Sequence, residues 1–110
     1  MQNYNPALIR ALNDALRQRH VGGRIVATNG VHARGLLFVA SALDKIAGPL
    51  TFTADNDPYG EHDFGAVTVF DSLLFWKIDY LSPDLLSAAV DPADEAACCR
   101  VLTIMLAEEY

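Results

Sequence analysis

The spacing of apolar residues predicts a helix near the start of the chain. Asn5-Pro6 is typical of a helix start, because an Asn side chain caps the first turn and proline loses no hydrogen bond at the first helical position. Apolar residues then recur every three or four positions until Gly22-Gly23, which ends the helix. The predicted buried stripe is Leu8, Ala11, Leu12, Ala15 and Leu16, and the predicted water-facing residues are Arg10, Asn13, Asp14 and Arg17.

A second helix is predicted from about His32 to Ala47, after a β-rich run over residues 24 to 28 and a turn at Asn29-Gly30. Gly48-Pro49 is its stop signal. Its predicted buried side is Leu36, Val39, Ala40, Leu43, Ile46 and Ala47. Residues 50 to 53 alternate between apolar and polar and predict a further short strand.

Two apolar runs, residues 64 to 70 and 73 to 80, predict a β-hairpin around Asp71-Ser72. This turn places Val69 opposite Leu74 and Val67 opposite Trp76 on a face that is expected to be core. The other face combines phenylalanines with Lys77 and Asp79, which is typical of a half-covered surface.

The last segment predicts a third helix, because Asp91-Pro92 repeats the cap-and-proline start of the first. Its apolar residues cover much of the helix circumference, so it is predicted to be the most buried. The fold class expected is α+β in a single domain, residues 1–110, with the element order α-β-α-β-β-β-α. A small, mostly antiparallel sheet containing the hairpin at about 64–80 is expected to pack against three helices.

Composition and charge reduce the number of function classes that fit this sequence. The 110 residues are 52% apolar, which is enough for a real core, and the net charge of -6 argues against nonspecific nucleic-acid binding. Residues 1 to 50 carry a net +4 and the remaining sixty carry -10. The second half therefore displays most of the carboxylates that could meet a basic partner.

Compartment signals are few. Cys98 and Cys99 are adjacent, which makes neither a disulfide nor a zinc pattern, and they are interpreted as small buried hydrophobes. The longest apolar run, residues 35 to 43, is about half of what a membrane helix needs, and the first ten residues do not form a signal peptide. A cytoplasmic protein that does not bind membranes is the expectation.

The densest polar cluster spans residues 55 to 63, and Asp57-Pro58-Tyr59-Gly60 within it fits a type I turn. Three interpretations stay open: a structural loop whose carboxylates accept backbone N–H groups, a partner-binding loop, and a site for a divalent metal. An EF-hand is excluded, because Ala66 stands where the bidentate Glu belongs. The candidate metal ligands are Asp55, Asp57, Glu61 and His62.

No catalytic residues emerge from the sequence. His62 and Asp63 are neighbours and would point to opposite faces of a strand, which argues against a general-base pair. The serines lack a nucleophile-elbow context and the cysteines lie in an apolar segment. The sequence therefore favours a protein that is not an enzyme.

Aromatic residues around the hairpin give a further candidate surface. Trp76 and Tyr80 are interpreted as core, whereas Tyr59 could supply contact area for a partner. Phe64, Phe70 and Phe75 would form an apolar patch suited to a homodimer if no helix covers them.

Three blocks of the sequence resemble a family of unknown function. They are DNDPYGEHDFG from Asp55, FWKIDY from Phe75 and RVLTIMLAEEY from Arg100, and the resemblance runs from about Arg24 to Tyr110. The resemblance implies a short alphaproteobacterial protein found on plasmids and mobile elements, and it supplies no catalytic residues. By analogy, it implies an anti-defence factor that blocks restriction or CRISPR machinery.

The function expected is a non-enzymatic acidic module that binds a basic protein or nucleoprotein complex, in part by imitating phosphates. The predicted contact residues are Asp55, Asp57, Tyr59, Glu61, Asp63, Glu108 and Glu109. No cofactor is expected. The alternatives are a small metal-dependent enzyme or metal sensor, which would hold a divalent metal at the four ligands named above, and a structural homodimer.

Overall fold

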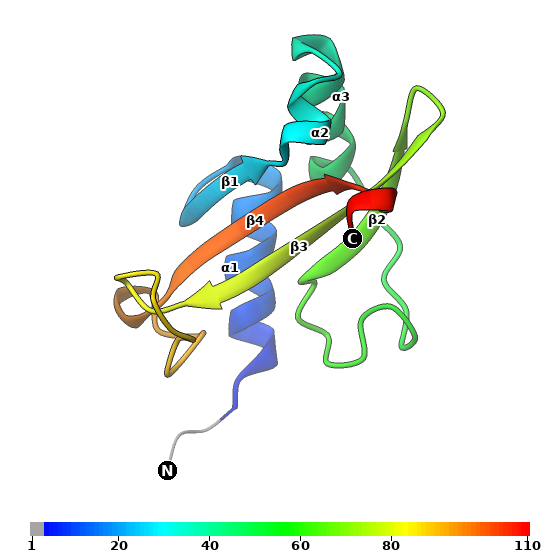
Figure 1. Cartoon of the computed structure of the whole chain (residues 1–110). Helices are drawn as coiled ribbons and strands as arrows, with labels where there is room; N and C mark the ends of the chain where they lie inside the picture. Colours follow the sequence, from blue (N-terminus) through cyan, green and yellow to red (C-terminus); the bar gives the residue numbers. More distant parts are fainter. Residues whose placement is uncertain (1–3) are drawn as a thin grey trace.

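The computed structural model describes residues 4–110 and contains one four-stranded sheet with helices packed against it (Figure 1). The helices are α1 (Pro6–Arg19), α2 (Asn29–His32), α3 (Leu36–Ala47) and the 3-10 turns η1 (Glu95–Ala97) and η2 (Ala107–Glu109). The strands are β1 (Gly23–Ala27), β2 (Phe64–Val69), β3 (Ser72–Leu81) and β4 (Cys99–Leu106). The strand order is β1-β4-β3-β2, with β1 parallel to β4 and the other neighbours antiparallel. The α+β class and the mostly antiparallel sheet are confirmed.

Helix α1 begins where its sequence predicts but ends at Arg19, three residues before the predicted stop at Gly22-Gly23, with His20 as its left-handed cap. The Asn5 side chain accepts a hydrogen bond from the Leu8 N–H at 3.1 Å, and Pro6 is the first helical residue. The predicted buried stripe is confirmed only at Leu16, because Leu8 and Ala11 are exposed and the other buried residues are Ile9, Asn13 and Arg17. The helix is rotated so that two polar side chains face the sheet, where they find polar partners that the helix pattern alone does not reveal.

The second predicted helix is two helices. Gly35 has a φ of +96°, which ends α2 and begins α3, since a left-handed backbone interrupts a right-handed helix. The buried residues of α3 are Phe38, Ala42 and Ile46, whereas Leu36 is 88% exposed. The strand predicted over residues 50 to 53 is also wrong, because these residues have no regular secondary structure.

The hairpin is confirmed with a shift of two residues in its register. Val69 pairs with Ser72 and Val67 with Leu74, so the two-residue turn is Phe70-Asp71. Both turn residues have positive φ, 46° and 68°, which suits the right-handed twist of the strands. A shift of two preserves the faces, and the predicted core residues of the hairpin are buried.

The prediction of a last helix is wrong, because residues 99 to 106 form β4, one of the two central strands of the sheet. Arg100, Leu102, Ile104 and Leu106 alternate toward the helices, while Val101, Thr103 and Met105 point to the opposite face. Asp91 caps a local turn by accepting the Ala93 N–H at 3.0 Å. The cap signal therefore begins a turn and is followed by a strand.

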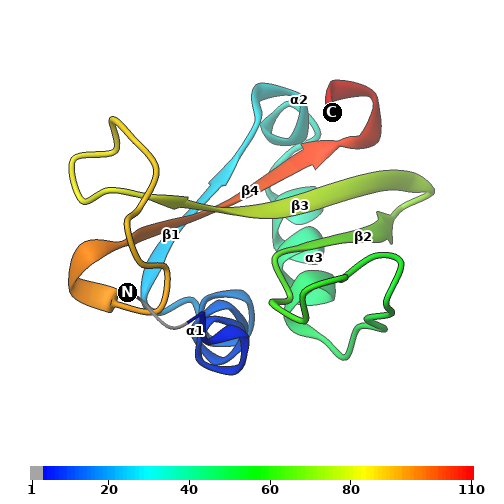
Figure 2. The same cartoon turned by 90° about the horizontal axis from the view of Figure 1, so that it is seen from below.

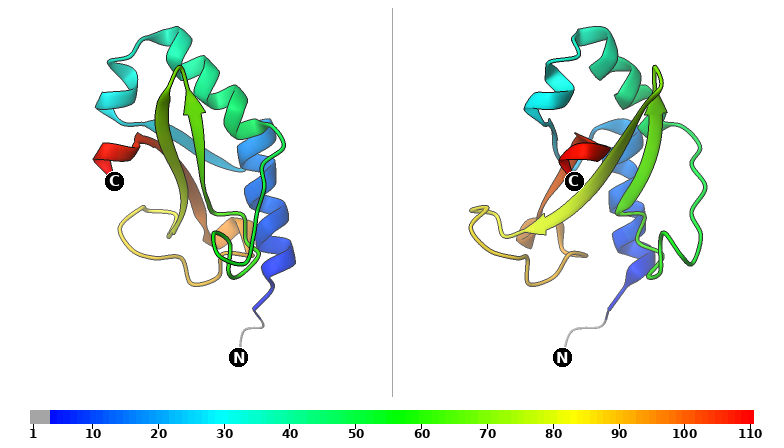
Figure 3. Two further views of the ribbon diagram at one scale, coloured as in Figure 1. Left: turned by 90° about the vertical axis from the view of Figure 1, so that its right-hand side faces the viewer. Right: turned by 45° about the vertical axis from the view of Figure 1, so that its right-hand side comes forward.

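The core lies between the sheet and the helices on one side of it. Figure 2 shows α1 and α3 on the same side of the sheet, and Figure 3 shows the other side largely uncovered. The core cluster contains Trp76, Leu74, Leu102 and Ile104 from the two central strands together with residues of the helices. Among residues 4–110, no helix is long and apolar enough to cross a membrane.

Gly65 tests the packing of this core. A Cβ at this position would lie 2.6 Å from Nε1 and 2.8 Å from Cε2 of the buried Trp76. We expect Gly65→Ala to lower the free energy of unfolding by about 1–3 kcal/mol, because the indole has no room to move. Urea denaturation measures this loss. The matched control is Gly48→Ala, whose Cβ would meet no atom closer than 3.4 Å, and equal stability of the two variants would contradict the packing described.

Candidate functional site

The acidic loop, residues 55 to 63, is fixed to the inner face of α1. Arg10 donates from Nη1 to the Gly60 carbonyl at 2.9 Å, and Asn13 donates from Nδ2 to the Glu61 carbonyl at 3.0 Å. The Gly60 N–H donates to the Asp57 carbonyl at 3.1 Å, which closes the turn predicted over residues 57 to 60. Side chains of the helix thus hold a loop that has no helix or strand of its own.

His62 lies between two carboxylates. Its Nδ1 is 2.9 Å from Oδ1 of Asp14, and its Nε2 is 3.6 Å from Oδ2 of Asp57. The ring stacks on Phe52 with centroids 3.8 Å apart and planes 9° apart. Asp57 is only 8% exposed and its Oδ1 also accepts the His62 backbone N–H at 3.1 Å. Both edges of the imidazole and one face are therefore occupied by the protein itself.

Asp14, Asn13 and Arg17 were assigned to the water-facing side of the first helix. All three instead contact the segment between α3 and β2: Arg17 donates to the Ile46 carbonyl at 2.7 Å and to the Gly48 carbonyl at 2.9 Å. The only signal in the sequence is an i, i+3 acid–base pair, Asp14 and Arg17, which lie 3.2 Å apart.

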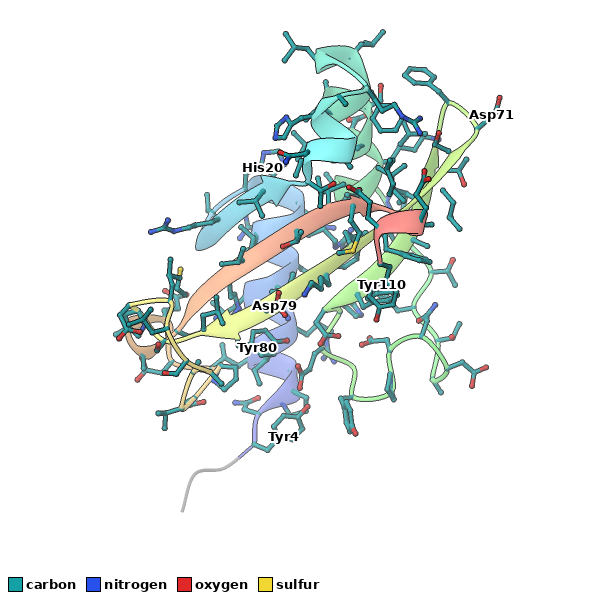
Figure 4. The ribbon with its side chains drawn as sticks, viewed as in Figure 1. Tyr4, His20, Asp71, Asp79, Tyr80 and Tyr110 are labelled. Atoms are coloured by element: carbon teal, nitrogen blue, oxygen red, sulfur yellow. The ribbon has the colours of Figure 1, made fainter. Side chains whose placement is uncertain are left out.

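Glu61 binds two tyrosine hydroxyls. Tyr80 donates to its Oε1 at 2.6 Å, and Tyr4 donates to its Oε2 (Figure 4). The hydrogen bond to Glu61 raises the pKa of Tyr4 to about 12. Burial, and then the same carboxylate, raises the pKa of Tyr80. Both phenols remain protonated at neutral pH and donate their hydrogen bonds to the Glu61 carboxylate.

Negative charge accumulates where the loop enters β2. The pKa of Asp63 is raised, first by burial and then by the charge of Glu61, with smaller contributions from Asp57 and Asp79. Asp79 lies on β3 (Figure 4) and pairs with Lys77 at 3.0 Å. Asp55 is exposed on the loop. We call this group the acidic rim: Asp55, Asp57, Glu61, Asp63 and Asp79.

The predicted metal ligands do not gather around one point. His62 is held by Asp14 and Asp57, and Glu61 is held by the two tyrosines. Across residues 4–110, no group of three or more His, Cys, Asp and Glu side chains is arranged to hold a metal ion. In the described residues, the four predicted ligands are therefore not brought together around one point, and metal binding by this loop stays a prediction.

Glu108 and Glu109 belong to a different part of the molecule. Glu109 accepts from the Thr28 hydroxyl at 2.6 Å and from the Leu106 N–H at 2.8 Å, and these bonds lower its pKa. Glu108 is 4.0 Å from Arg34. They lie in η2, and their contacts are with Thr28 and Arg34, on either side of α2, rather than with the acidic loop. Partner binding by these two residues stays a prediction.

The three phenylalanines of the predicted apolar patch are divided between two places. The ring centroids of Phe64 and Phe75 lie 5.6 Å apart on the uncovered face, where Tyr110 packs against both rings. Phe70 is in the hairpin turn, 64% exposed and 6.3 Å from Phe38 of α3. The homodimer stays a prediction. Tyr59, at the tip of the acidic loop, is 72% exposed.

The sheet, the helices on one face and the loop tied to α1 define a small α+β domain with an acidic loop at one edge. A family model described as "Protein of unknown function (DUF3768)" matches residues 27–109, and the chain belongs to this family. The three sequence blocks quoted above fall almost entirely within the match. No curated protein and no solved structure matches the chain.

Asn13 is the first test of this site. It is fully buried and also accepts from Nε of Arg100 at 2.8 Å. We expect Asn13→Ala to lower the free energy of unfolding by about 3 kcal/mol, because it leaves a buried guanidinium with one partner fewer. Urea denaturation measures this loss, and Gln18→Ala, an exposed position on the same helix, is the control. A loss no greater than that of the control would contradict the role of Asn13.

The raised pKa of Asp63 gives the second test. A carboxyl group whose pKa is higher in the folded than in the unfolded state makes the protein less stable as the pH rises from the unfolded-state pKa to the folded-state pKa. We expect Asp63→Asn to raise the melting temperature at neutral pH, with the difference disappearing as the pH falls below 3.8, the usual pKa of Asp.

Asp84 is a control of opposite sign. Its pKa is lowered by the Ser82 hydroxyl and the Leu86 N–H, so Asp84→Asn removes a contribution that is present above pH 3.8 and lost below it. Melting curves between pH 3 and 8 compare the two variants. A lower melting temperature for Asp63→Asn at neutral pH would contradict the charge arrangement of the acidic rim.

Proposed function

We propose that this protein is a non-enzymatic interaction module that binds a basic partner surface through the acidic rim. The observation that carries the proposal is the clustering of Asp63 with Glu61, Asp57 and Asp79 where the acidic loop enters β2; burial, and then the charges of these neighbours, raise the pKa of Asp63. Like charges brought together in this way weaken the fold at neutral pH. Groups whose arrangement lowers the stability of the fold are typical of functional sites, where binding or activity compensates for the lost stability.

The geometry of the loop suits binding without large rearrangement. Glu61 is fixed by hydrogen bonds at a partly exposed position, and the buried Asp57 holds the loop behind it by accepting the His62 N–H. Binding of a preformed charged surface loses little conformational entropy. Tyr59 adds an exposed aromatic ring at the loop tip, a residue type that is enriched where partners bind.

The partner that we propose is a protein or nucleoprotein complex with a basic nucleic-acid-binding surface. Carboxylates on a fixed loop would occupy this surface in the place of phosphates. The family resemblance, with its implied setting on plasmids and mobile elements, points to restriction or CRISPR machinery, which such an anti-defence protein would inhibit. We further propose that it acts in the bacterial cytoplasm, where these complexes work.

A pull-down with immobilised restriction and CRISPR surveillance complexes at low salt tests this function. We expect one of these complexes to retain the protein, with retention falling as salt is added, because surface charges are screened. The double variant Asp55→Asn with Asp63→Asn should bind at least about tenfold more weakly, a loss that instability cannot explain because Asp63→Asn stabilises the fold.

The matched control neutralises two exposed acids outside the acidic rim, Asp44 on α3 and Asp84 in the segment after β3. Asp44→Asn with Asp84→Asn has the same net charge as the rim variant and should bind like the unmodified protein. The proposal is wrong if no complex is retained at low salt, or if the two double variants bind equally well.

A further inference from the structure

A groove lies beside β1, the edge strand of the sheet, on the face that carries the helices. It has a volume of about 550 Å³ and is lined by residues of β1, β4, α2 and α3 and by His20 at the end of α1. Most of its lining is apolar, whereas His20 after α1 and His32 at the end of α2 add polar side chains. His20 is labelled in Figure 4. The apolar lining residues are Ile25, Val26, Ala27, Val39, Leu43 and Ile104.

The backbone of β1 has unused hydrogen-bonding groups along this groove. The Thr28 N–H donates to the Ile104 carbonyl at 3.0 Å, so the even-numbered residues of β1 direct their N–H and C=O groups to β4. Because these directions alternate along a strand, the N–H and C=O groups of Ile25 and Ala27 point to the free edge. Within residues 4–110, neither residue makes a backbone hydrogen bond outside the sheet. This edge can accept another strand.

Two arginines bring positive charge to this edge. Arg19 is the last residue of α1, and Arg24 projects from β1 onto the uncovered face. Both are exposed, and neither forms an ion pair in the part of the chain that the structure describes. Glu109 lies beyond the end of β1, where it accepts from the Thr28 hydroxyl. An added strand that carries carboxylates would therefore meet complementary charge, whereas a basic strand would be repelled.

We propose that β1 and its groove bind an extended acidic segment of a partner protein by strand addition. The side chains of β1 alternate, with Ile25 and Ala27 toward the helices and Arg24 and Val26 toward the uncovered face. A strand paired with β1 follows the same alternation. Its apolar side chains enter the groove between β1 and α3, and its acidic side chains lie beside Arg24. This mode gives affinity through the main chain and specificity through alternate side chains.

This surface is separate from the acidic rim. The sheet order places β1 at one edge and β2, which follows the acidic loop, at the other. Failure of the acidic rim to bind a basic complex would leave the strand-addition site unaffected, and the reverse also holds.

A blocked hexapeptide that alternates valine and glutamate is the probe, with a valine–lysine peptide of the same length as its counterpart. We expect the acidic peptide to shift the amide NMR signals of residues 23–27, and the basic peptide to leave them unchanged. Shifts confined to residues 55–63, or equal shifts with both peptides, would overturn the proposal.

Two N-methylated forms of the acidic peptide test the main-chain pairing. One is methylated at every valine and the other at every glutamate, so each lacks the N–H groups on one edge of the strand. Strand addition requires that one form loses at least about tenfold in affinity while the other binds normally, and the sensitive form reveals the strand direction. Equal effects of the two methylations, whether none or both, would overturn the proposal.

A charge-reversed variant of the protein tests whether positive charge beside β1 attracts the acidic peptide. Arg24→Glu should weaken binding of the acidic peptide by about tenfold and allow the lysine peptide to bind. Lys45→Glu, at an exposed position on α3 outside the groove lining, is the matched control and should leave both affinities unchanged. Equal behaviour of the two variants would overturn the cationic role of the edge.

Discussion

The hydrogen bond between Asn13 and Arg100 joins α1 to the sheet, and the positions of the other polar groups depend on it. Arg100 is 1% exposed in the central strand, and its Nε donates to Oδ1 of Asn13 at 2.8 Å. A buried guanidinium must have its donors satisfied, since each unmet donor costs free energy. The Pro92 carbonyl and the Asn13 side chain accept hydrogen bonds from the Arg100 guanidinium, and Cζ of Arg100 lies 5.3 Å from the centroid of the Tyr80 ring. This requirement turns a polar face of α1 toward the sheet.

The acidic loop is a consequence of that orientation. Once the Asn13 amide is buried, its Nδ2 donates to the Tyr80 hydroxyl and to the Glu61 carbonyl. The same turn of helix brings Asp14 to His62 and Arg17 to the carbonyls that follow α3. A segment without secondary structure thus obtains fixed positions from one helix, and its Glu61 carboxylate is ordered by tyrosine hydroxyls instead of by a basic side chain.

Local signals in the sequence were sufficient for the elements whose pattern is periodic and one-sided. The Asn5 cap predicted α1, and the alternation in residues 64 to 80 predicted the hairpin faces even with the turn misplaced. The helix predicted over residues 99 to 106 is wrong because β4 is apolar on both faces, which hides the twofold period of a strand. The β-branched Val101, Thr103 and Ile104 were the signal that favoured a strand.

The candidate site was less predictable than the fold, because its contacts join residues that are distant in the chain. Asp14 and His62 are 48 residues apart and Asn13 and Arg100 are 87 apart. A helix pattern assigns such polar residues to solvent, since solvent is the default partner of a polar side chain. Only the tertiary structure reveals that another part of the chain has replaced the water.

The uneven charge of the sequence persists in space, and α1 connects its two poles. Arg10, Asn13 and Asp14 on the first half of the helix contact the acidic loop, whereas His20 at its end lines the groove beside β1. The strand order keeps β1 and β2 at opposite edges, so Arg19 and Arg24 beside β1 lie apart from the carboxylates that precede β2. Both surfaces remain free for partners of opposite charge. Any mechanical coupling between them must pass through α1 or the central strands, and the buried Asn13–Arg100 contact resists it, because moving the helix would unpair a charge inside the protein.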